Sequence, residues 1–201
     1  MKKIIFIILL SLLVIGSYAQ KTDISTKKSE IKSLLKTHLY YKDPNPIWQE
    51  DADKVNIFVK NILSKEYKKA EKDKLRAKAF ELLYENTQCI MFEDMVDIKR
   101  MSKRKSMCYL AIAMLSDEYR YPAFIEDARQ CIKELDMEDM SREETLIDIV
   151  EIRMILGDNE MQTQEKNRRI LSYIDLFNER KSKIENKVFV NDVTKLFNIL
   201  R

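Results

Sequence analysis

Glycine is almost missing from this chain of 201 residues, which contains two glycines and three prolines. Glycine supplies the positive φ angles on which tight β-hairpins, nucleotide-binding loops and strained catalytic turns depend. The scarcity of glycine argues against a sheet protein with tight hairpins and against a glycine-rich phosphate-binding loop. Helices need neither residue in their interiors, so the composition predicts an all-α fold.

Histidine is scarcer still, because His38 is the only one. A Ser-His or Cys-His nucleophile needs a histidine base oriented by a third group, and a zinc site usually draws on several His or Cys ligands at short spacing. The three cysteines lie far apart with no Cys-x-x-Cys among them. We therefore expect no enzyme activity, no metal and no cofactor, and we interpret His38 as a helix-end residue beside the C-terminal dipole.

An excess of charge of one sign is also lacking, since 36 Lys and Arg stand against 33 Asp and Glu. Such a chain has no global field to steer it to nucleic acid, so no nucleic-acid partner is expected. The hydrophobic fraction of 45% is normal for a globular domain.

The N-terminus has the three parts of a secretory signal. Lys2 and Lys3 precede an apolar stretch, 4–15, and small residues follow at Ser17 and Ala19. The stretch is shorter than the roughly 20 residues that a bilayer span needs, although an uncleaved anchor is the alternative. We predict a signal peptide over 1–19, a single all-helical domain over 20–201 and no transmembrane segment after cleavage. The protein is then exported, and is periplasmic or secreted.

Apolar spacing predicts seven or eight helices. They are expected at about 25–40, from Pro46 to about 62, at 73–98, around 107–115, from Pro122 to about 135, at 141–157, at 160–183 and from 189 onward, although 188–190 is also β-prone. Nine consecutive apolar residues at 107–115 place that helix at the centre of the domain. Ser141 and Glu144 fit a capping box, and Gly157 fits a C′ glycine. The predicted architecture is a set of antiparallel helical hairpins forming a bundle or short α-solenoid.

Three ungapped windows share a pattern of helix end, turn and helix: 62–83, 114–135 and 155–176, with Leu at the second and last positions of each. At class level this pattern resembles HEAT or tetratricopeptide hairpin repeats. The alternative is that any two amphipathic hairpins align this well.

Two segments are candidates for a binding surface. The first places Tyr40, Tyr41 and Trp48 around a stiff loop, where aromatic rings stack on a ligand or pack a corner between helices. The second is a basic run expected in an exposed turn, so that its replacement should change stability little. It comprises Lys99, Arg100, Lys103, Arg104 and Lys105.

Carboxylates offer the remaining route to acid–base chemistry. Glu144, Asp148 and Glu151 share one face of the predicted helix 141–157, and Glu93, Asp94 and Asp97 form a second group. Both groups are interpreted as solvated surface.

Cys108 and Cys131 are a candidate disulfide pair. Their midpoint, at position 119.5, coincides with the turn expected at 117–121, so they should lie level on two antiparallel helices. By the same reasoning Cys89 is expected to be free, and the oxidation state of the pair is left open.

These observations favour an exported protein-interaction or ligand-binding module of the bacterial envelope, whose partner is another protein or an envelope polymer. An immunity protein that neutralises a toxin is one alternative, and an enzyme that uses carboxylates alone is another.

The signal peptide gives the first testable prediction. Cleavage after Ala19 should leave Gln20 as the first residue, so N-terminal sequencing of protein recovered from its host should start there or be blocked by cyclised glutamine. An intact Met1 in that protein would contradict export by this route.

Overall fold

The computed structural model describes residues 23–42, 46–88, 95–115, 122–133, 135 and 139–201. Every regular element in these ranges is a helix, and no strand occurs there, which confirms the predicted all-α class. A helix at 23–38 comes first. It is followed by α2 (Pro46–Ile62), α3 (Lys69–Gln88), α4 (Met95–Met114), α5 (Ala123–Lys133), α6 (Ser141–Gly157), α7 (Thr163–Arg180) and α8 (Lys187–Leu200). The predicted signal segment 1–19 lies outside the described residues.

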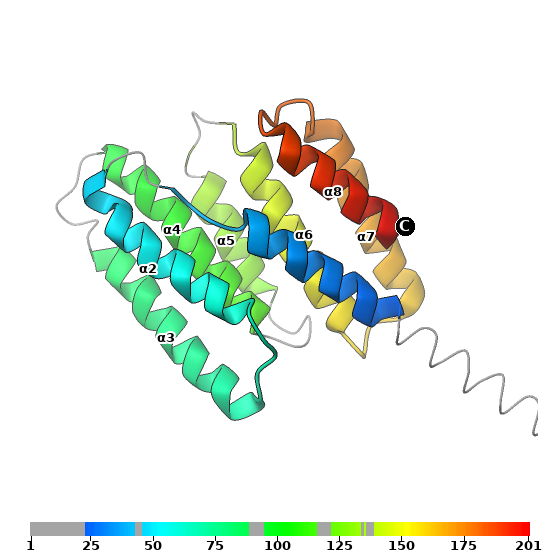
Figure 1. Cartoon of the computed structure of the whole chain (residues 1–201), viewed down its shortest axis with the longest axis horizontal. Coiled ribbons are helices and arrows are strands. Elements are labelled where there is room, and N and C mark those ends of the chain that lie inside the picture. The colour runs from blue at the N-terminus through cyan, green and yellow to red at the C-terminus, as the bar shows by residue number, and fades with distance from the viewer. Residues whose placement is uncertain (1–22, 43–45, 89–94, 116–121, 134, 136–138) are drawn as a thin grey trace, which may run out of the picture.

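The helices form an array in which α2 and α3 lie at one end and α7 and α8 at the other (Figure 1). The pair α4 and α5 lies next to α2 and α3, and α6 continues the array towards α7. The helix 23–38 crosses in front of α6 and brings the start of the described chain close to its end (Figure 1). This arrangement fits the predicted bundle or short solenoid of helical hairpins.

The central helix is α4, as its apolar run predicts. Residues 107–115 are all buried except Tyr109, which is half-buried. Helices α2, α3, α5 and α6 all pack against α4. One continuous hydrophobic core results, extending from Ile31 on the first described helix to Leu200 at the end of α8.

Two arginines close the C-terminal end of α4. Arg76 on α3 donates to the carbonyl oxygen of Leu115 at 2.9 Å, and Arg153 on α6 donates to that of Met114 at 3.1 Å. The last carbonyls of a helix have no partner within the helix, and cations there also complement the dipole. Residues from both sides of α4 therefore fix the end of the central helix.

Several predicted boundaries are wrong in detail. The basic run falls within α4 rather than in a turn, because Met101 and Arg104 continue the buried face of that helix towards its start. Residues 188–190 are helical. Gly157 ends α6 as the last helical residue, but no glycine in the described residues has a positive φ.

The predicted capping box at the start of α6 is also wrong. Ser141 is the first helical residue, and its backbone N–H donates to the Asp139 carboxylate at 2.8 Å. Hydrogen bonds from the side chain and the backbone of Ser141 lower the pKa of the Asp139 carboxyl. The N-cap position of α6 is therefore Met140, and the side chain that accepts from its first N–H is that of Asp139.

The three repeat windows coincide with the junctions of α2 with α3, α4 with α5 and α6 with α7. The leucines at the second position, Leu63, Leu115 and Leu156, are all buried at the helix ends. The leucines at the last position differ, since Leu135 is buried and Leu176 is 41% exposed. A genuine repeat of these hairpins stays a prediction.

Within the described ranges, none of the helices is long and apolar enough to cross a membrane.

Cys108 and Cys131 are both buried on the packed helices α4 and α5, and no disulfide joins them in this structure. Burial raises the pKa of the Cys108 thiol to about 12, and the neighbouring Cys131 adds to the increase. Cys89 lies outside the described residues, and oxidation of the pair stays a prediction.

The thiols give a reactivity prediction. A pKa of about 12 in place of the usual value near 8.5 reduces the thiolate fraction at pH 8 by about a thousandfold. Iodoacetamide should therefore modify Cys108 at least about a hundredfold more slowly in native protein than in urea. The rate of modification is measured by peptide mass spectrometry.

The same urea samples, left unreduced, report the oxidation state. Protein from the host should show one titratable thiol if Cys108 and Cys131 are joined, and three if they are not. Comparable native and unfolded rates of modification would contradict the burial of Cys108.

Candidate functional site

Tyr40 and Tyr41 follow one residue, Leu39, after the end of the helix 23–38. The side chain of Asn56 on α2 holds Tyr41 by its backbone, accepting from the Tyr41 N–H at 2.9 Å and donating to the Tyr41 carbonyl at 2.7 Å. Tyr40 is half exposed. The segment is thus fixed by α2 while one aromatic ring remains open to solvent.

These tyrosines line a narrow apolar slot between α4, α5 and α6, with a volume of about 30 Å³. That is room for about two water molecules or one small apolar group. The complete lining is Leu39, Tyr40, Tyr41, Lys103, Ser106, Met107, Leu110, Ile132, Arg142, Glu143, Leu146 and Ile147. The structure therefore brings together three of the residues predicted for a binding surface, Tyr40, Tyr41 and Lys103, with the addition of Arg142.

A larger groove adjoins the slot, with a volume of about 790 Å³. Most of its lining residues are charged or polar, so we call it the polar groove, although apolar atoms of these residues form slightly more than half of its surface. It runs between the start of α6 and the segment that joins α7 to α8, and its lining is Lys103, Asp139, Met140, Ser141, Arg142, Glu143, Lys183, Ile184, Glu185 and Asn186. Lys103, Arg142 and Glu143 line both the slot and the groove. A neighbouring hollow of about 490 Å³ shares Asp139 and Lys183 and reaches Glu144.

Arg142 links three parts of the chain at this site. Its Nη2 donates to the carbonyl oxygen of His38 at 2.7 Å, and its Nη1 lies 3.2 Å from the Glu143 carboxylate. The guanidinium also lies 5.5 Å from the ring centroids of Tyr40 and Phe189. The carbonyl contact and the two rings within cation–π range restrict where the guanidinium lies.

His38 has a structural partner on the last helix. Its Nε2 lies 3.0 Å from Oδ2 of Asp192, and its ring packs edge-on against Phe189 at 5.1 Å. The contact with His38 lowers the pKa of the Asp192 carboxyl. His38 is buried at the end of its helix and joins that end to α8. This contact supports the interpretation of His38 as a helix-end residue.

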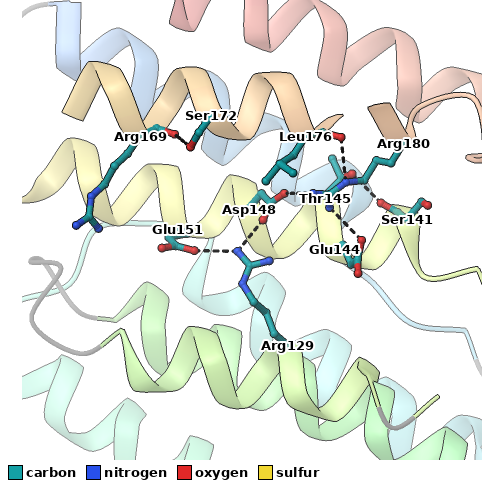
Figure 2. A network of polar contacts seen from close by, with 10 residues as sticks. All are labelled: Arg129, Ser141, Glu144, Thr145, Asp148, Glu151, Arg169, Ser172, Leu176 and Arg180. Atoms are coloured by element: carbon teal, nitrogen blue, oxygen red, sulfur yellow. Dashed lines mark hydrogen bonds and ion pairs between the residues drawn. The ribbon is translucent and has the colours of Figure 1, made fainter. Parts of the chain in front are cut away.

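The interpretation of the α6 carboxylates as solvated surface is wrong for two of the three. Asp148 is fully buried and Glu151 is buried, whereas the Glu144 side chain is 43% exposed. Figure 2 shows Asp148 on α6 between Arg129, which reaches it from α5, and Arg180, which reaches it from α7. The charged face of α6 therefore points into the protein.

The distances in this network are short. Arg129 Nη2 lies 2.6 Å from Asp148 and 2.8 Å from Glu151. Arg180 lies 3.0 Å from Asp148 and 3.3 Å from Glu144. Burial raises the pKa of Asp148, against the opposing effect of both arginines. Burial also lowers the pKa of Arg129, but its two carboxylate partners outweigh that effect and hold the pKa above its usual value.

The physical reason for the correction lies in the rest of α6. Apolar residues occupy its other faces as well, so that 12 of its 17 residues are buried. A helix that is apolar on most faces is an interior helix, and its carboxylates must then be paired. The run Leu146, Ile147, Ile149, Val150 and Ile152 carried that signal in the sequence.

The other described members of the basic run, Arg104 and Lys105, do not line the site. Arg104 is 2% exposed, so the prediction that this run is solvent-exposed is wrong for it, and Lys105 is half-buried. Neither lines the slot or the groove, and nor does Trp48 at the start of α2. Lys99 and Arg100 are helical, but their side chains lie outside the description, as do those of Glu93, Asp94 and Asp97.

Over the described part of the chain, no group of three or more His, Cys, Asp or Glu side chains is placed to hold a metal ion. What the site presents instead is an apolar slot, a polar groove and, at their boundary, the Arg142 guanidinium with its contacts to His38, Tyr40 and Phe189.

Arg142, Arg129 and Arg180 are the residues that sequence reasoning missed. Their importance depends on contacts with residues distant in the chain, and no local pattern marks them.

No family model, no curated protein and no solved structure matches this chain.

The buried network gives a stability prediction. Asp148→Ala leaves two guanidinium groups without their shared carboxylate and should lower the free energy of unfolding by about 3–5 kcal/mol, measured by urea denaturation. Glu144→Ala on the same face should cost no more than about 1 kcal/mol, because that side chain is exposed to water. Equal small losses in both variants would show that the network contributes little.

Proposed function

We propose that this chain is a helical binding module of the bacterial envelope, and that it holds a segment of another protein in the polar groove. The observation that carries the proposal is the continuity of the groove with the apolar slot, since Lys103, Arg142 and Glu143 line both. A polar channel with an apolar recess at its side suits an extended polypeptide, whose main chain is polar and whose side chains alternate in character.

The dimensions support this role. The groove, at about 790 Å³, lies within the range of roughly 300–1,000 Å³ that is typical of ligand sites. The slot admits one small apolar group, which suits a single anchoring side chain. Tyr40 stands at its edge, half exposed, and offers a ring to whatever enters.

The charges of the groove favour a protein over an anionic envelope polymer. Its lining includes three cations, Lys103, Arg142 and Lys183, and three acids, Asp139, Glu143 and Glu185. A polyanion would meet as many repulsive as attractive partners there. A peptide of mixed charge and many amide groups meets complementary partners of both signs.

The α6 carboxylates support a binding role over acid–base catalysis. Asp148 and Glu151 are salt-bridged to Arg129 inside the core, where they stabilise the packing of α5 on α6. Glu144 opens onto the neighbouring hollow but pairs with Arg180. The location in the envelope rests on the N-terminal signal sequence alone.

The function is tested by selecting peptides on the protein, purified in the form that its host accumulates. Two random libraries are used, one displayed with free amino termini and one with free carboxyl termini. Synthetic copies of the selected peptides are then titrated by fluorescence anisotropy. Lys183→Glu reverses a charge of the groove wall and should weaken binding by about tenfold or more.

Lys181→Glu is the matched control, because Lys181 is an exposed lysine two residues earlier that lines neither cavity. The dissociation constant of the selected peptides for this variant should stay within about twofold of their value for the unaltered protein. Selected peptides that bind both variants equally would place the binding site elsewhere. Failure of both libraries would contradict peptide binding.

A further inference from the structure

The guanidinium of Arg142 has donors to spare at the boundary of slot and groove. Arginine carries five N–H donors, and the His38 carbonyl and the Glu143 carboxylate each accept from one of them. The other three have no acceptor among the described residues. The Arg142 side chain is 21% exposed and lines both cavities.

The orientation of this group is set before any ligand arrives. The rings of Tyr40 and Phe189 flank the guanidinium, each at 5.5 Å from its central carbon. The carbonyl of His38 fixes one edge of the plane at 2.7 Å. An oriented guanidinium binds a carboxylate with two parallel hydrogen bonds and loses little side-chain freedom in doing so.

The boundary of slot and groove carries two cations. Lys103 and Arg142 line both cavities, beside one acid, Glu143. A carboxylate that enters there meets the ammonium group of Lys103 and the N–H donors of Arg142.

The slot beside these charges is apolar and small. Leu110, Leu146 and Ile147 contribute to its wall, and its volume of about 30 Å³ limits what enters to the end of a side chain such as Val or Leu. A single carboxylate attached next to a small branched apolar side chain describes the last residue of a polypeptide. An internal residue carries no such charge next to its side chain.

We propose that the site recognises the free carboxyl terminus of a partner protein, with the terminal carboxylate bound between Arg142 and Lys103 and an aliphatic terminal side chain in the slot. The preceding residues then lie along the polar groove. This inference rests on the proposed function, since it names the part of the partner that the groove receives.

The test uses fluorescein-labelled pools of pentapeptides that end in Leu after four randomised positions, one pool with a free carboxylate and one amidated. A third pool ends in Gly with a free carboxylate. Anisotropy titrations with the purified protein should show the Leu acid binding about tenfold or more tightly than the Leu amide, and more tightly than the Gly acid.

Two variants assign the effect to the site. Lys103→Gln should remove most of the difference between acid and amide, while Lys105→Gln, two residues along the same helix and outside both cavities, should preserve it. Arg142→Gln should also remove it. Because Arg142 contacts three segments, the circular dichroism and melting temperature of the Arg142→Gln variant are compared with those of the unaltered protein. If Arg142→Gln unfolds, the result for Lys103→Gln decides the test.

The outcomes separate the two proposals. Equal binding of acid and amide pools would overturn recognition of the terminus and leave peptide binding in the groove standing. Binding of no pool would overturn both. If free 4-methylpentanoate competed at the same concentration as the Leu acid pool, the site would take a small carboxylic acid, which would overturn the assignment to a protein terminus.

Discussion

The pairing of Asp148 with Arg129 and Arg180 is the constraint on which the arrangement of the helices depends. A fully buried carboxylate is costly unless it is paired, and here the partners come from the helices on either side of α6. Helix α6 must therefore lie between α5 and α7 at the level where both guanidinium groups reach it (Figure 2). Apolar packing alone tolerates small shifts along a helix, whereas this contact specifies one register.

The same helix connects the interior with the surface. Its buried middle carries Asp148 and Glu151, and its first turn carries Arg142 and Glu143, which line the slot and the groove. Glu144 stands between the two regions, since it opens onto the neighbouring hollow and pairs with Arg180. Whatever occupies the groove thus meets side chains whose backbone is anchored by the ionic network.

Arg142 also accounts for how the two ends of the described chain are held together. It donates to the carbonyl of His38, while His38 contacts Asp192 and Phe189 of α8. The helix 23–38, α6 and α8 meet at this point, and the aromatic side of the slot is built on it. The candidate site is therefore a product of the closing contact between distant segments and not of any one motif.

Sequence alone was sufficient for the class of the fold. The near absence of glycine and the spacing of apolar residues predicted helices, and nine apolar residues in a row identified α4 as the centre of the core. These features work because helix formation and burial depend on neighbours within a few residues along the chain. The aromatic loop and the basic run brought Tyr40, Tyr41 and Lys103 forward as candidates, although as members of two separate surfaces.

Tertiary structure alone decided which charges are buried and which meet. A spacing of i, i+4 and i+7 shows that three carboxylates share a face, but not whether that face meets water or two arginines from other helices. The basic run was mistaken for a turn because its buried members, Met101 and Arg104, are defined by the helices that cover them. Arg142 carried no local signal at all, since each of its partners but Glu143 lies far from it in sequence. The physical reason is common to all three cases: the cost of a charge depends on its surroundings in space, and the sequence lists only its surroundings along the chain.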